Sequence, residues 1–101
     1  FNDNGGTAGV NLFNAGMRGR KTQYYDGGHR AMCFIKFPDE SWAGPPRDID
    51  ELTHVQDLFP TLAELSFGKK LDDAKFDGVS LMPLFGKEPK KLPERTLVVQ
   101  Y

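Results

Sequence analysis

The stretch "THVQDLFPTLAELSFG", residues 53–68, predicts the clearest helix of this 101-residue chain. Its apolar residues recur at helical spacing and fall on one face: Val55, Leu58, Leu62 and Leu65. Because proline is tolerated only in the first turn of a helix, we expect the helix to begin at Asp57, after an irregular turn. Gly68 is the expected stop, so the predicted helix covers residues 57–67.

Two apolar segments on either side of this helix predict strands. "AMCFIKFP", residues 31–38, is rich in aromatic and aliphatic residues and predicts a strand over 31–37, in which Cys33 would be buried. "RTLVVQY", residues 95–101, predicts a second strand over 96–101, and Phe1 with Asn2 resembles the tail of another. Between helix and last strand, "VSLMPLFG", residues 79–86, predicts one or two helical turns. This order indicates an α/β layer arrangement.

Composition narrows the classes of protein that the chain could be. A length of 101 residues allows one small domain. The net charge of -1 does not favour a nucleic acid or a membrane surface as a partner. Because no apolar run approaches the length of a membrane-spanning helix, we expect no membrane span. The single cysteine excludes an internal disulfide.

The first residues, "FNDNGGTAGV", place Asp3 and Asn4 directly before a glycine pair. One interpretation is a surface turn, because Asn, Asp and Gly tolerate turn geometry. The other is half of a metal site, because both side chains offer hard oxygen donors. The polar, glycine-rich run that continues to Arg30 predicts a long ordered loop, and such loops are usually functional or disordered.

Four segments, which overlap the stretches quoted above, follow one another in a specific order: "NDNGGT" (2–7), "FNAGMRGRKTQYYDGGHRAMCFIKFP" (13–38), "HVQDLFPTLAEL" (54–65) and "FDGVSLMPLFG" (76–86). Together they resemble the sulfatases, alkaline-phosphatase-like hydrolases that cleave sulfate esters. The resemblance covers essentially the whole chain. It implies an α/β fragment of that fold, a truncated sheet with flanking helices. Residues 1–101 would then be a partial catalytic domain that lacks the N-terminal nucleophile region and the C-terminal subdomain.

The resemblance also implies roles for individual residues. Asp3 and Asn4 match positions that bind a divalent metal, most often Ca²⁺, with Mg²⁺ as the alternative. Lys21 matches the lysine that contacts the sulfate group. His29 could contact substrate oxygens or donate a proton, and an exposed or structural imidazole is an equal alternative. We expect His54 to be structural.

The family's nucleophile is a formylglycine made from the first residue of a Cys/Ser-x-Pro-x-Arg motif. Cys33 is followed by Phe34, Ile35 and Lys36, so it does not match. The nucleophile is therefore expected in the missing N-terminal part. We also expect Asp26 and Arg30 to pair and hold the loop, and the isolated chain to be inactive and weakly folded.

Three interpretations follow: a fragment of a sulfatase, a non-catalytic binding or interaction module derived from one, and an unrelated small α/β domain. The first implies a sulfated small molecule or sulfated carbohydrate as partner, together with the remainder of a sulfatase chain. By resemblance, the compartment would be periplasmic, secreted or lysosomal.

Overall fold

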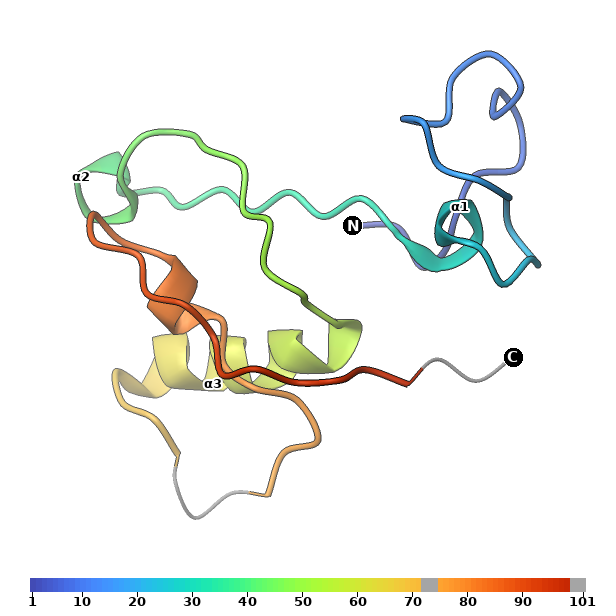
Figure 1. Ribbon diagram of the computed structural model, residues 1–101. Helices are drawn as coiled ribbons and strands as arrows, with labels where there is room; N and C mark the ends of the chain where they lie inside the picture. Colours follow the sequence, from blue (N-terminus) through green and yellow to red (C-terminus); the bar gives the residue numbers. More distant parts are fainter. Residues whose placement is uncertain (72–74, 99–101) are drawn as a thin grey trace. The chain divides into compact units, whose positions relative to one another are not determined.

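The computed structural model describes residues 1–71 and 75–98, and the chain divides into two compact units. We call residues 1–36 the N-terminal unit and residues 37–98 the C-terminal unit. The N-terminal unit contains helix α1 (Asp26–His29). The C-terminal unit contains α2 (Glu40–Ala43), the 3-10 turn η1 (Val55–Asp57), α3 (Leu58–Phe67) and the 3-10 turn η2 (Met82–Leu84) (Figure 1).

Helix α3 confirms the prediction made from its local signals. Asp57 is its N-cap, and Pro60 lies in the first turn. Gly68 ends the helix with a φ of 67°, a left-handed conformation that glycine adopts at little cost. The expected irregular turn before the helix is η1, and the expected helical turn within residues 79–86 is η2.

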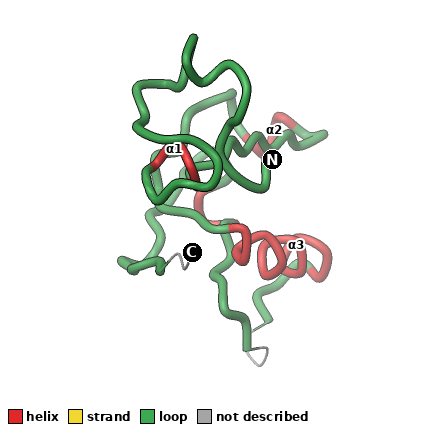
Figure 2. The backbone as a smooth tube through the Cα atoms, turned by 90° about the vertical axis from the view of Figure 1, so that its right-hand side faces the viewer, coloured by secondary structure: helices red, strands yellow, loops and turns green. Residues whose placement is uncertain are grey.

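The predicted sheet is absent from residues 1–71 and 75–98, which contain helices, turns and loops only (Figure 2). Residues 31–36 form a loop, and the backbone N–H of Asn2 donates a hydrogen bond to the carbonyl of Met32. A strand needs a ladder of such bonds to a neighbour, and one bond does not make a ladder. Cys33 is consequently exposed, which corrects its expected burial. Of the second predicted strand, residues 96–98 are loop, and residues 99–101 lie outside the described part.

The buried face of α3 is not its apolar face. Val55, Leu62 and Leu65 are 56%, 58% and 47% exposed, whereas Pro60 and Thr61 are buried. Thr61 faces the segment that contains η2, where Leu81 and Leu84 are the buried apolar residues of the described chain. Helical spacing finds an apolar stripe, but the position of the packing partner decides which face is covered.

Helix α2 was not predicted. Asp39 begins it, because its Oδ1 accepts hydrogen bonds from the backbone N–H (2.9 Å) and the hydroxyl (2.6 Å) of Ser41. Phe37 packs edge-on against Trp42 and Phe85, with ring centroids 5.0 and 4.9 Å apart. Arg47 lies in the loop that follows α2. Its guanidinium donates hydrogen bonds to the carbonyls of Leu84 and Gly86 and so connects this loop to the end of η2.

Candidate functional site

All four predicted site residues lie in the N-terminal unit, and backbone hydrogen bonds bring their segments together. The N–H of Gly5, just after Asn4, donates to the carbonyl of Gly28 in α1 at 2.9 Å. The N–H of Lys21 donates to the carbonyl of Gly6 at 3.0 Å. The glycine pair therefore joins the Asp3–Asn4 segment both to α1 and to the Lys21 turn. Asp3 and Asn4 lie in a bend, and Phe1 and Asn2 before them are loop rather than the expected tail of a strand.

Helix α1 depends on glycine because other backbone segments touch it directly. Gly27 and Gly28 are buried. A Cβ on Gly27 would overlap the carbonyl oxygen of Gly19, and one on Gly28 would overlap that of Gln23. The same holds for Gly5, whose Cβ would overlap the carbonyl oxygen of Gly27. Only residues without a side chain allow this approach.

The loop before α1 is held by a residue that the sequence did not single out. The Asn14 side-chain amide donates to the carbonyls of Met17 and Gly19, both at 2.8 Å. The N–H of Gly27 donates to the carbonyl of Arg18 at 2.8 Å. These bonds fix the loop against α1 just ahead of Lys21. Asn14 carried no motif signal, because its partners are carbonyl groups that any residue provides.

His29 lies at the end of α1, with its Nε2 3.8 Å from Oδ1 of Asp26. These side chains are 40% and 67% exposed, so the pair is worth little as a stabilising ion pair. Arg30 approaches the same residue through its backbone, since its N–H donates to the Asp26 carbonyl at 2.7 Å. The imidazole therefore keeps an accessible ring that could meet a substrate oxygen.

A complete metal site is not present in the described ranges 1–71 and 75–98, where no group of three or more His, Cys, Asp or Glu side chains could hold an ion. Asp3 and Asn4 offer oxygen donors, which suit Ca²⁺ and Mg²⁺. Because Ca²⁺ takes about 6–8 oxygen ligands, Asp3 and Asn4 alone would not complete a site for it.

A second polar cluster lies in the C-terminal unit around Asp57, which is fully buried. Its carboxylate accepts hydrogen bonds from the backbone N–H groups of His54 (2.7 Å) and Val79 (2.9 Å). Both terminal nitrogens of the Arg95 guanidinium also donate to it, in a bidentate pair. We call Asp57, Thr61 and Arg95 the Asp57 cluster.

Thr61 extends this cluster to η2. Its hydroxyl donates to the Asp57 carbonyl and accepts from the N–H of Leu81 at 2.8 Å. Gly78 permits the contact, because a Cβ there would overlap the carbonyl oxygen of Gln56. His54 is structural, as expected: its Nδ1 accepts from the N–H of Gln56 at 3.3 Å and caps η1.

The charge state of the cluster follows from its hydrogen bonds. Burial alone would raise the pKa of Asp57, but the bonds from Arg95 and from the N–H groups of Val79 and His54 outweigh it and lower that pKa. The bond to Asp57 raises the pKa of Arg95. Both groups are therefore charged at neutral pH, so the cluster is a buried ion pair that holds residues 54–61, 78–81 and 95 together.

In residues 1–71 and 75–98, no helix is both long enough and apolar enough to cross a membrane.

Comparison with known proteins gives consistent relatives. The chain is 38% identical to steryl-sulfatase of Mus musculus over 80 residues, which are 79% of this chain and 12% of that protein. It is 35% identical to arylsulfatase J of Mus musculus over 79 residues (78% and 13%), and 35% identical to a sulfatase of Formosa agariphila over 91 residues (87% and 16%). The chain thus spans 12–16% of the length of these relatives. No protein-family model matches it, and no solved structure was found to match.

Proposed function

Because the chain belongs to the sulfatase family, we propose that it acts as part of a sulfatase that cleaves sulfate esters with the help of a divalent metal. The homology implies the alkaline-phosphatase-like fold, and a sheet with flanking helices would form once further strands pair with residues 31–37 and 96–101. One observation supports the proposal most. The segments of Asp3–Asn4, Lys21 and His29 are bonded to one another within 36 residues.

Asp3 and Asn4 would be two of the metal ligands. A carboxylate and an amide oxygen fit a hard cation such as Ca²⁺, with Mg²⁺ as the alternative. When bound, the ion would polarise a sulfate oxygen as a Lewis acid. Gly5 and Gly6 hold the ligand segment in position through their bonds to Gly28 and Lys21.

Lys21 would bind the sulfate group and stabilise the negative charge that develops on its oxygens. Its exposed side chain stands on a turn that is anchored to Gly6, and a compact ammonium on a flexible stem suits this contact. His29 would contact substrate oxygens or donate a proton to the leaving group, since its ring is accessible beside Asp26. We assign the formylglycine nucleophile to another part of the protein, because Cys33 lacks the required motif.

The test uses the natural polypeptide that contains this sequence. Its intact mass and sequence should show a longer chain with a Cys/Ser-x-Pro-x-Arg motif. In that protein, Asp3→Ala should abolish turnover of an aryl sulfate and weaken Ca²⁺ binding measured by calorimetry. Lys21→Ala should lower turnover but leave Ca²⁺ binding intact.

The matched control is Lys36→Ala, which removes an exposed lysine of the same unit and should change neither property. Full activity in both the Asp3 and the Lys21 variants would refute the site assignment. A natural polypeptide that ends near residue 101, binds sulfated ligands and has no turnover would favour the alternative, a non-catalytic binding module.

A further inference from the structure

Charge is distributed unevenly between the two units. The N-terminal unit contains five lysines and arginines against two aspartates, a formal charge of +3. The rest of the chain has eight basic and twelve acidic residues, so the near-neutral total hides a basic unit. Such a local excess of one sign attracts ligands of the opposite sign.

The fold gathers several of these basic residues around α1. The Arg18 carbonyl accepts from Gly27, and the N–H of Arg20 donates to the Gln23 side chain at 3.1 Å. Arg30 directly follows the helix and is bonded to Asp26. The loop that carries Arg18 and Arg20 is thus fastened to the helix that leads into Arg30.

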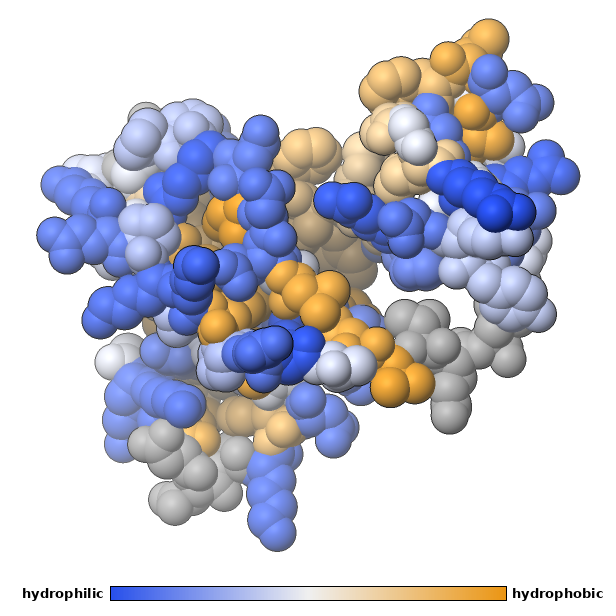
Figure 3. Space-filling view, viewed as in Figure 1, coloured by the Kyte–Doolittle hydropathy of each residue, from blue (hydrophilic) through white to orange (hydrophobic). Residues whose placement is uncertain are grey.

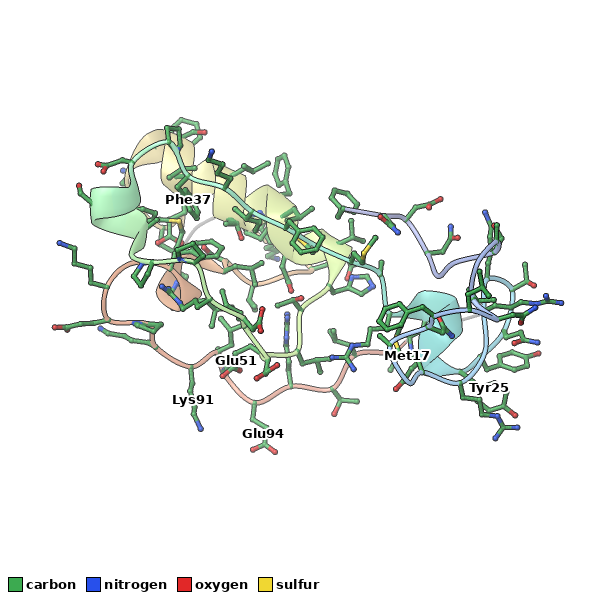
Figure 4. All side chains as sticks on the ribbon, turned by 90° about the horizontal axis from the view of Figure 1, so that it is seen from above. Met17, Tyr25, Phe37, Glu51, Lys91 and Glu94 are labelled. Atoms are coloured by element: carbon green, nitrogen blue, oxygen red, sulfur yellow. The ribbon has the colours of Figure 1, made fainter. Side chains whose placement is uncertain are left out.

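The Arg18 side chain has a defined position in the N-terminal unit. Its guanidinium carbon lies 3.7 Å from the centroid of the Tyr25 ring, a cation–π contact. Figure 4 shows Tyr25 at the edge of the N-terminal unit. Stacking holds the planar group in place, while its edge N–H groups can still bind an anion.

These arginines have no carboxylate partners within the described part of the chain. The ion pairs His29–Asp26 and Arg95–Asp57 do not involve them. Arg18, Arg20 and Arg30 are all exposed. Their charge is therefore available to a ligand, apart from the stacking of Arg18 on Tyr25.

We propose that Arg18, Arg20 and Arg30 form a surface that binds additional sulfate groups of an oligosulfated carbohydrate chain, beside the sulfate held at Lys21. This inference rests on the proposed function and narrows its substrate class. A monosulfated small molecule needs one sulfate contact, whereas three additional arginines suit a ligand with several sulfates. Guanidinium groups bind such tetrahedral oxyanions in a bidentate manner.

The experiment measures binding of a heparin oligosaccharide of defined length to the natural polypeptide that contains this sequence, by calorimetry at several salt concentrations. One variant carries Arg18→Gln, Arg20→Gln and Arg30→Gln. The matched control carries Lys87→Gln, Lys90→Gln and Lys91→Gln, which removes three exposed charges from the C-terminal unit. Circular dichroism checks that both variants keep the helical content of the parent chain.

The arginine variant should bind about tenfold or more weakly, with a salt dependence reduced by roughly two to three released ions, while the control binds nearly as the parent does. Equal losses in both variants would overturn the proposal, because non-specific or unfolded chains respond to total charge. Equally tight binding of a single-stranded oligonucleotide of matched charge would also overturn it. Heparin binding does not require turnover. If the Asp3 and Lys21 variants refuted the proposed function, the binding measurement would therefore still test the arginine surface separately.

Discussion

Asp57 illustrates what sequence can and cannot predict at the scale of one residue. Its position at the start of a helix follows from neighbouring residues, above all from Pro60 and Gly68. The partners of its carboxylate do not follow from neighbouring residues. The carboxylate accepts hydrogen bonds from Val79 and Arg95, which are 22 and 38 residues away. No local pattern identifies such partners, although Asp57 and Val79 fall in two of the four ordered segments that resemble the sulfatases.

At this scale, Asp57→Ala should destabilise the C-terminal unit by about 3–5 kcal/mol, because it leaves the largely enclosed Arg95 charge without its partner. Urea unfolding followed by the fluorescence of Trp42, the single tryptophan, measures the change. Asp48→Ala, at an exposed position, is the control and should change stability by less than about 0.5 kcal/mol. Similar midpoints for both variants would contradict the buried ion pair.

The same carboxylate predicts the response of the unit to acid. Because the pKa of Asp57 is lowered in the folded state, its contribution to stability is complete above the unfolded pKa of about 3.9. The contribution is lost as the pH falls through the lower, folded pKa. Urea midpoints measured between neutral pH and strong acid should therefore fall steeply at the acid end, and Asp57→Asn should flatten that decline. An unchanged acid limb in the variant would refute this origin.

At the scale of elements, helices and strands differ in how far they can be predicted. Helix α3 follows from signals within its own sequence. The segments 31–37 and 96–101 have strand composition, but a strand forms only with a neighbour, and the described residues provide none. Helix α1 was not predicted, because its glycines are poor helix formers. Glycine is needed there because neighbouring backbone segments leave no room for a Cβ.

Helix α3 offers a test of which face matters. Thr61→Val removes the hydroxyl that accepts from the Leu81 N–H, and should lower stability by about 1–3 kcal/mol. Leu62→Ala changes a side chain that is 58% exposed and should have a much smaller effect. Thermal unfolding of both variants gives the comparison. A larger loss for Leu62 would restore the apolar face as the packed one.

At the scale of the whole molecule, apolar residues lie outside rather than inside. Leu12, Phe13 and Phe34 are 93%, 80% and 84% exposed. Figure 3 shows apolar side chains, in orange, on the surface of both units. The buried apolar residues of the described chain are Leu81 and Leu84. Relatives several times longer could cover these surfaces with segments that the 101 residues do not contain.

The isolated chain should consequently associate in solution, bind a hydrophobic dye and show no turnover of an aryl sulfate with added Ca²⁺. Sedimentation, dye fluorescence and a hydrolysis assay measure these properties. A soluble monomer with a sharp unfolding transition and no activity would favour the binding-module alternative. Metal-dependent turnover that Cys33→Ala abolishes would overturn the assignment of the nucleophile to another part of the protein.

The hydrogen bond from Gly5 to Gly28 also bears on chemical ageing. Asn-Gly sequences deamidate readily, because the glycine nitrogen attacks the asparagine side chain and forms a succinimide ring. In this chain the nitrogen next to Asn4 is engaged with the Gly28 carbonyl at 2.9 Å, and that contact opposes the attack. We therefore expect the fold that positions Asn4 also to slow the conversion of its amide to a carboxylate, which would add a negative charge to one of the proposed ligands.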